Sequence, residues 1–270
     1  MDGAGNDFVC INNIKENIAE QNFPALARRL CDRNTSVGAD GMMVVEKAQS
    51  GEADFAMLFY NRDGSMGEMC GNGARCICRF GFENFLSGSS QKVMTTAGLL
   101  TGERLDQNLY RVRLQSPENL RMNEKALLDG KEYSYSYVEL GNPGIPHAVV
   151  PIENLMSADR KEMFNLGRKF RFYEAFEKGA NVNFYEKISD SEIVLLTYER
   201  GVEDFTKACG TGSASTVYIM MLSGETSGKG VKVNSMGGQL IIDICSGDEG
   251  RDKIYLSGPA DIVEKGNIEI

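Results

Sequence analysis

The chain has 270 residues, 42% of them hydrophobic and 25% charged, which is typical of a soluble globular protein with one or two domains. Its formal net charge of −9 argues against nucleic-acid binding, because phosphate contacts require a basic surface. No apolar run approaches the roughly 20 residues of a membrane-spanning helix, so we expect no membrane association.

Residues 1–7 lack the basic flank and the apolar segment of a signal peptide. The seven cysteines are odd in number and irregularly spaced, so they do not form a recognisable disulfide framework. These features predict a cytoplasmic location, where thiols stay reduced. The one histidine, His147, is the only imidazole that a Cys/His zinc site could recruit, and we expect no metal.

The first half of the chain alternates short apolar segments with turn signals. Segments with helical spacing lie at 25–31 and after Cys70, up to Phe85. Strands are predicted at 8–12, 42–46, 55–60, 93–96, 98–105 and 110–114. The Ser-Pro-Glu-Asn sequence at 116–119 predicts a boundary between a domain at 1–117 and a second at 118–270, with the last segment, about 259–270, returning to the first domain.

The second half repeats this plan with variations. A rigid loop is predicted at 141–147, where the sequence reads Gly-Asn-Pro-Gly-Ile-Pro-His. Helices are predicted at 157–164 and at about 213–222, the second directly after another Cys-Gly turn. Strands are predicted at 133–140, 180–186, 192–198, 231–233, 239–244 and 253–256.

Cys70 and Cys209 occupy matching places in the two halves. Each follows a strand and a polar loop, begins a Cys-Gly-x-Gly sequence and precedes a helix. This internal repeat predicts an α+β fold of two pseudo-symmetric domains, each mostly antiparallel sheet wrapped around a central helix. The active site would lie in the cleft between the domains.

A cysteine at the start of a helix meets backbone N–H groups that have no intrahelical partner, and it meets the positive end of the helix dipole. Both favour the thiolate, and the following glycines let a carboxylate approach the same N–H groups. Two such loops could place one sulfur on each side of an amino-acid α-carbon. One thiolate would remove the α-proton and the opposite thiol would supply another, so the pattern predicts inversion at that carbon.

The interpretation of a cysteine as a small buried hydrophobic residue is weaker for Cys70 and Cys209 than for the other five cysteines. The other five are interpreted as small buried hydrophobic residues: Cys10, Cys31, Cys76, Cys78 and Cys245. A Gly-x-Gly before a helix can cradle a phosphate, but no Gly-Lys-Ser/Thr follows here. A metal or redox cluster on Cys70, Cys76 and Cys78 has no recognised metal-site spacing, and a helix would scatter these side chains.

Along nearly its whole length the sequence resembles the diaminopimelate epimerases, which are cofactor-independent amino-acid racemases. The resemblance lies in Gly-Ala-Gly-Asn-Asp-Phe at 3–8, the segment 61–75 around Cys70, Tyr-Glu-Arg-Gly at 198–201 and Ala-Cys-Gly-Thr-Gly at 208–212. It implies an isomerase that converts LL-diaminopimelate to meso-diaminopimelate in lysine and peptidoglycan synthesis. It also implies that the enzyme needs no cofactor, binds a small amino-acid substrate and forms a homodimer.

The resemblance also implies which residues form the site. Cys70 and Cys209 would be the catalytic acid–base pair, and Glu199 and His147 would assist proton transfer near the thiols. The substrate-binding residues would be Asn6, Asn61, Gly71, Asn72, Asn142, Asn181, Glu199, Arg200, Gly210 and Thr211. The helix-start residues of this set would bind the reacting α-carboxylate, and Arg200 would pair with the distal carboxylate through its two-pronged guanidinium.

The sequence departs from the family pattern at three places. The family usually reads Gly-Asn-Pro-His where this chain has residues 141–147, so either Asn142 or Ile145 can take the substrate-contacting position. Gly41 stands where some members have a substrate-contacting glutamine, and Phe205 replaces a common glutamate. Two alternatives therefore stay open: a racemase of another amino acid, such as histidine, and a non-catalytic amino-acid-binding protein on the same fold.

Overall fold

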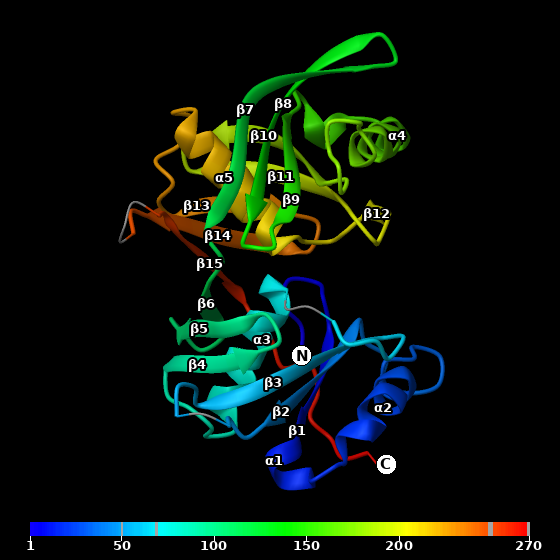
Figure 1. Cartoon of the computed structure of the whole chain (residues 1–270), viewed down its shortest axis with the longest axis vertical. Helices are drawn as coiled ribbons and strands as arrows, with labels where there is room; N and C mark the ends of the chain where they lie inside the picture. Colours follow the sequence, from blue (N-terminus) through cyan, green and yellow to red (C-terminus); the bar gives the residue numbers. More distant parts are fainter. Residues whose placement is uncertain (50, 68–69, 248–250, 269–270) are drawn as a thin grey trace. The chain divides into compact units, whose positions relative to one another are not determined.

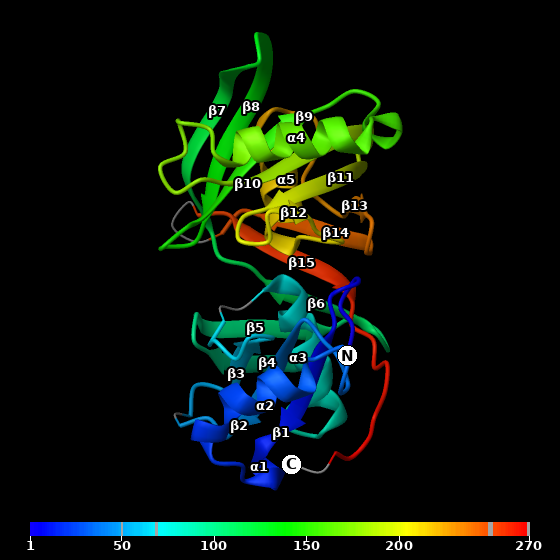
Figure 2. The same cartoon turned by 90° about the vertical axis from the view of Figure 1, so that its right-hand side faces the viewer.

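The computed structural model describes residues 1–49, 51–67, 70–247 and 251–268 (Figures 1 and 2). The chain divides into two compact units, Met1–Arg113 with Ser257–Ile270, and Leu114–Leu256. The division follows Arg113, whereas the sequence analysis placed a boundary after Pro117. Within the described residues, no helix has both the length and the apolar character needed to cross a membrane.

The first unit is a six-stranded mixed sheet with three helices. Its helices are α1 (Asn13–Glu16), α2 (Phe23–Leu30) and α3 (Gly71–Glu83). Its strands are β1 (Phe8–Asn12), β2 (Gly41–Glu46), β3 (Phe55–Asn61), β4 (Ser90–Thr95), β5 (Gly98–Arg104) and β6 (Leu109–Arg113), in the spatial order β1-β2-β3-β4-β5-β6. The pairs β1–β2 and β3–β4 are parallel, and the other neighbours are antiparallel.

The second unit has a similar mixed sheet, with the spatial order β14-β13-β11-β10-β9-β8-β7 and β12 beside β11. Its helices are α4 (Arg160–Arg171) and α5 (Gly210–Leu222). Its strands are β7 (Pro117–Leu128), β8 (Lys131–Leu140), β9 (Ile145–Pro151), β10 (Asn181–Ser189), β11 (Glu192–Glu199), β12 (Asp204–Phe205), β13 (Val231–Ser235) and β14 (Gly238–Cys245). Strand β15 (Lys253–Pro259) spans the division between the units.

The two units share one chain plan, which confirms the predicted α+β fold with an internal repeat. In chain order, β1-α2-β2-β3-α3-β4-β5 corresponds to β9-α4-β10-β11-α5-β13-β14. The pairings of β9–β10 and β11–β13 are parallel, and those of β10–β11 and β13–β14 are antiparallel, as in the first unit. Helices α3 and α5 therefore occupy equivalent positions, and each has 13 residues.

In each unit the equivalent helix packs inside the curve of its sheet. Helix α5 contacts β8, β9, β10 and β14, and α3 contacts β1, β5 and β6 (Figure 1). Most of α5 is buried and uncharged, which removes the polar face that a surface helix would show. Helices α2 and α4 build separate apolar clusters, the first with β2 and β3 and the second with β10 and β11 (Figure 2).

The predicted boundary segment 116–119 and the predicted loop 141–147 both contain strand residues. Strand β7 begins at Pro117, and because it is an edge strand the missing proline N–H removes no ladder bond. Its turn-like asparagines, Asn119 and Asn123, have positive φ and lie at register shifts against β8. Strand β9 includes His147, so the turn between β8 and β9 is confined to residues 141–144.

Arg75 is a charged residue at the centre of the first unit, with none of its surface exposed. Its guanidinium donates to the carbonyl oxygens of Gly3 at 3.3 Å, Gly71 at 3.1 Å and Pro259 at 3.2 Å, and to Asn72 Oδ1 at 3.0 Å. Burial lowers the pKa of Arg75. The side chain thus ties the N-terminal segment, the start of α3 and the C-terminal segment to one point.

We expect Arg75→Met to lower the free energy of unfolding by about 3 kcal/mol or more, because buried oxygens lose their donor. Arg75→Lys should lower the free energy of unfolding by less, since an ammonium group retains three N–H donors. Arg79→Met, one turn along α3, is the matched control, because Arg79 donates to one carbonyl, that of Ala260. Urea titration of the three variants measures the difference, and an Arg75→Met protein as stable as Arg79→Met would contradict this account.

Candidate active site

In the first unit, the topology gathers the predicted residues at one edge of the sheet, the edge formed by the ends of the strands and not by an outermost strand. Strands β1 and β2 begin at this edge, where Phe8 pairs with Gly41, and the antiparallel β3 ends there, where Gly41 pairs with Asn61. Because β4 runs parallel to β3, the connection that contains α3 starts at this edge and returns to the other. Cys70, at the start of α3, therefore lies on the same edge as Asn61 and the segment that precedes β1.

The second unit repeats this arrangement with different side chains. His147 on β9 pairs with Asn181 at the start of β10, and β11 ends beside them at Glu199. The backbone N–H of Arg200 donates to Asn181 Oδ1 at 2.8 Å, which fixes the turn after β11. Cys209 then begins α5 at this edge. Strand pairing thus brings His147, Asn181 and Glu199 to one edge, and Arg200 and Cys209 follow in the adjoining turn and helix start.

Each cysteine is the N-cap of its helix, and its sulfur accepts a hydrogen bond from the first turn. Cys70 Sγ accepts from the Gly73 N–H at 3.2 Å, and Cys209 Sγ accepts from the Gly212 N–H at 3.3 Å. Thr211 Oγ1 lies 3.5 Å from Cys209 Sγ. An N–H donor and the positive helix end both stabilise a negative sulfur, so the arrangement favours a thiolate. The residues predicted to bind a carboxylate, at 71–72 and 210–211, form the first turns.

Other cysteines have the opposite environment. Cys31, Cys76 and Cys78 have no exposed surface, and burial raises their pKa values, to about 11 for Cys31 and about 12 for Cys78. These three are held as neutral thiols in the core. Within the described residues, no cluster of three or more His, Cys, Asp or Glu side chains could hold a metal ion.

Two ionisable groups at this edge, His147 and Glu199, are both held towards their neutral forms. His147 is fully buried, and burial together with the positive charge of Arg200 lowers its pKa to about 3. Its Nδ1 lies 3.1 Å from Asn183 Nδ2. Burial raises the pKa of the Glu199 carboxyl. At neutral pH the imidazole is therefore uncharged.

The predicted asparagines differ in how they are held. Asn61 Nδ2 donates to Ser65 Oγ at 3.0 Å, and the Asn61 N–H donates to the Ser65 carbonyl oxygen. Asn6 Oδ1 is buried, and no donor among the described residues reaches it. Asn142 is exposed in the turn 141–144, whereas Ile145 is half-buried at the start of β9. Residues Glu68 and Met69 of the motif before Cys70 lie outside the described residues.

Sequence reasoning missed Arg75 and Asn183 as contributors to the site. Arg75 interrupts an apolar helical run, and a charged residue in such a run is a usable signal of a buried, paired cation. Asn183 stands between Val182 and Phe184 in a strand whose first five residues are all buried. Because both faces are covered, the strand has no polar–apolar alternation that could have identified an inward polar side chain.

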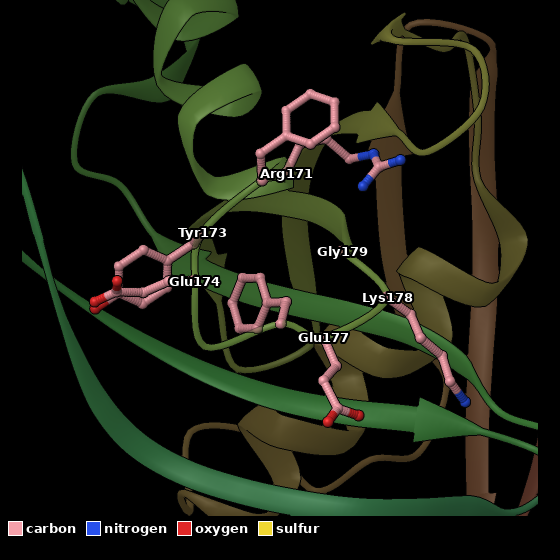
Figure 3. A pocket seen from close by; sticks show the side chains of 8 residues that line it. Arg171, Tyr173, Glu174, Glu177, Lys178 and Gly179 are labelled. Atoms are coloured by element: carbon pink, nitrogen blue, oxygen red, sulfur yellow. The ribbon is translucent and has the colours of Figure 1, made fainter.

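A separate hollow of about 520 Å³ lies beside the loop that follows α4 (Figure 3). It is lined by Arg171, Phe172, Tyr173, Glu174, Phe176, Glu177, Lys178 and Gly179. None of the predicted site residues lines it, although the carbonyl oxygen of Lys178 accepts from Arg200 Nη1 at 3.3 Å. The loop that lines the hollow therefore holds Arg200 through a backbone contact, and the hollow itself contains none of the predicted catalytic residues.

We expect Gly73→Ala and Gly212→Ala to have opposite effects on stability, although the two glycines are equivalent. A Cβ at Gly73 would lie 3.4 Å or more from its neighbours, so the helix should gain up to about 1 kcal/mol from the better helix former. A Cβ at Gly212 would lie 2.2 Å from Asn183 Oδ1, and we expect a loss of about 1–3 kcal/mol. Urea unfolding measures both, and equal effects would contradict the contact.

The buried neutral imidazole makes stability depend on pH. The unfolded chain titrates His147 near its ordinary pKa of about 6.5, whereas the folded chain resists protonation down to about 3. Stability from this group is present above pH 6.5 and is lost as the pH falls towards 3, by about 2–3 kcal/mol between pH 7 and 4.5. His147→Gln should lack this component, so the difference in unfolding free energy between the two proteins should change with pH by that amount. A constant difference would contradict the burial of a neutral ring.

The chain is similar to known proteins over nearly its whole sequence. A family model described as Diaminopimelate epimerase matches residues 1–117 and 140–263. A protein of Aquifex aeolicus named Diaminopimelate epimerase is 36% identical over 280 residues, which cover 99% of this chain and 96% of the relative. A protein of Archaeoglobus fulgidus with the same name is 36% identical over 279 residues, covering 100% and 95%.

Solved structures share the fold at low sequence identity. A Bacillus anthracis phenazine biosynthesis protein of the PhzF family has a TM-score of 0.74 and 15% identity, with 100% of this chain and 95% of that chain covered. A hydroxyproline epimerase from Agrobacterium vitis has a TM-score of 0.65 and 13% identity, with 86% and 76% covered. These likenesses concern the fold, whereas the family model and the relatives match the sequence itself over nearly its whole length. The chain belongs to the diaminopimelate epimerase family, a family of isomerases.

Proposed function

We propose that the chain is a diaminopimelate epimerase that converts LL-diaminopimelate to meso-diaminopimelate, with Cys70 and Cys209 as the acid and base. The observation that carries the proposal is the repeated helix cap. At equivalent positions in the two units, a cysteine sulfur accepts a hydrogen bond from a backbone N–H in the first turn of a glycine-rich helix. Membership of the family and relatives named Diaminopimelate epimerase support the substrate.

The proposed reaction is a proton exchange at the α-carbon. One thiolate takes the α-proton and becomes a thiol, while the other thiol gives its proton to the opposite face and becomes a thiolate. Negative charge that develops on the α-carboxylate during this step is held by the helix-start N–H groups of residues 71–72 and 210–211. No cofactor or metal takes part in the proposed step.

The remaining site residues would bind the rest of the substrate and support the thiols. Asn6 Oδ1, a buried acceptor with no donor among the described residues, is suited to an ammonium group. Asn61, Asn142 and Asn181 would contact the substrate, and the Arg200 guanidinium would pair with its distal carboxylate. Glu199 and His147 would stand beside the thiols and assist them.

A racemase of another amino acid is the second candidate, and it is favoured by the surroundings of Gly41. A Cβ at this position would lie 2.4 Å from the Phe59 ring, so the side chain that contacts substrate in some family members has no room here. We propose that either enzyme is a cytoplasmic homodimer that binds neither nucleic acid nor membrane. The net charge of −9 supports the absence of nucleic-acid binding.

We expect the wild-type protein in heavy water, without added cofactor, to introduce deuterium at the α-carbon of LL-diaminopimelate. Mass spectrometry of the recovered amino acid measures the exchange, and histidine and proline serve as competing candidates. Cys70→Ala and Cys209→Ala should each lower the rate of inversion at least about 100-fold, the scale of a lost acid or base.

Cys245→Ala is the matched control, because this half-exposed thiol lies at the end of β14 rather than at a helix start. Its activity should equal that of the wild type. Exchange with another amino acid in place of diaminopimelate would favour the second candidate. Inversion that survives Cys70→Ala would reject the two-thiol mechanism. No exchange with any candidate amino acid would reject the proposal that the chain is an amino-acid epimerase.

A further inference from the structure

Asn183 is a fully buried amide that connects His147 to the strands around it. Its Nδ2 lies 3.2 Å from the Ala148 carbonyl oxygen and 3.1 Å from His147 Nδ1. Its Oδ1 accepts from Thr197 Oγ1 at 3.0 Å. Every polar atom of this amide thus has a partner, and all the partners belong to the second unit.

These contacts determine which way the amide points. A carbonyl oxygen can only accept, so the atom of Asn183 that faces Ala148 must be the nitrogen. The same NH₂ group directs its second N–H to His147 Nδ1, and that ring nitrogen must therefore present a lone pair. A neutral imidazole with an accepting Nδ1 carries its proton on Nε2.

We propose that Asn183 is a positioning residue that holds His147 as the Nε2–H tautomer, so that the imidazole is a hydrogen-bond donor and not a proton acceptor. Nε2 already bears a hydrogen, so the ring can accept a further proton only on the lone pair of Nδ1. Protonation of Nδ1 would set an N–H against the Asn183 NH₂, two donors face to face in a dry site. The low pKa of His147 agrees with this, and Arg200 is the charged group that acts on the ring.

The position of Nε2 supports a donor role. This atom is buried, and within the part of the chain that the structure describes it has no hydrogen-bond partner. A buried N–H without an acceptor costs about 1–3 kcal/mol, so a ligand that supplies an acceptor is bound more strongly. If the proposed function holds, the acceptor is an anion of the reacting site, a thiolate above all. His147 then stabilises the thiolate and does not remove the thiol proton.

Asn183 also touches the start of α5. Its Oδ1 approaches Gly212 so closely that a Cβ there would lie 2.2 Å away, and the Gly212 N–H donates to Cys209 Sγ. The amide is therefore held between His147 on one side and the turn that carries Cys209 on the other. Rotation of the amide is blocked by both neighbours, which makes the tautomer a property of the fold.

Nitrogen NMR of the ring tests the tautomer without substrate. The chain has one histidine, so ¹⁵N-histidine labelling gives two ring-nitrogen signals that belong to His147 alone. We expect a protonated Nε2, an unprotonated Nδ1 and no titration between pH 8 and 5. A protonated Nδ1, a mixture of tautomers or titration near pH 6.5 would overturn the proposal.

Asn183→Asp reverses the polarity of the contact at nearly the same shape. We expect the proton to move to Nδ1 and the ring to titrate at higher pH, because a carboxylate accepts where the amide donated. Thr197→Val is the matched control, since it removes a bond to the same amide but leaves Nδ2 in place, and its tautomer should equal that of the wild type. The wild-type spectrum decides the tautomer even if Asn183→Asp does not fold.

Kinetics separate this proposal from the proposed function. On the substrate that exchanges deuterium, Asn183→Asp should lower kcat at least about 10-fold with a smaller change in KM, because the donor is lost in the reacting state. Full activity with a reversed tautomer would overturn the donor role. A wild-type spectrum as expected, with no exchange on any amino acid, would reject the proposed function and leave the tautomer assignment standing.

Discussion

A helix that begins on a cysteine has first-turn N–H groups without carbonyl partners, and much of the fold serves to keep that arrangement in place. The sulfur occupies the cap, which satisfies one N–H and leaves the turn suited to an anion. The sheet edge brings strand ends and helix start together. Burial then fixes the turn: at Gly212 the neighbouring amide approaches so closely that only glycine fits. Packing thus requires a glycine at Gly212, whereas the equivalent Gly73 has room for a methyl group.

The two units share a chain plan but support their cysteines by different physics. Near Cys70 the stabilising group is the buried cation Arg75. Its guanidinium donates to Asn72 in the first turn of α3 and interacts electrostatically with Cys70. Near Cys209 the support is the neutral contact of Asn183 with His147. Under the proposed mechanism, one sulfur must be a thiolate while the other is a thiol. Two unlike environments bias such a pair in a way that two identical halves could not.

Much of this plan could be predicted from the sequence, because its signals are local. The repeated Cys-Gly-x-Gly and the alternating strand and helix segments identified both helices that follow a cysteine, and most strands. The segments that failed are those in which a local signal was overridden by a neighbour. Pro143 and Pro146 made residues 145–147 resemble the end of a loop, yet Pro146 lies before the β10 pairing begins, so it interrupts little of that ladder. The first turn of α5 was placed too late because glycine is a poor helix former, although here the cysteine cap and the glycine contacts select the helix.

Under the proposed function, the two ends of the substrate are bound by different kinds of atoms, the reacting end by backbone N–H groups and the distal end by side chains. Backbone N–H groups at a helix start recognise a carboxylate regardless of the side chains around them, so the reacting end of an amino acid can be held the same way for many substrates. The distal end has no such common element, and under the proposed function it would depend on side chains at strand ends and on the turn 141–144. Asn142 is exposed and Ile145 is half-buried, so neither is packed as tightly as Gly212 and Asn183. Under the proposed function, substrate choice can therefore change at Asn142 or Ile145 while the two caps stay as they are, whereas the Phe59 ring leaves no room for a side chain at Gly41.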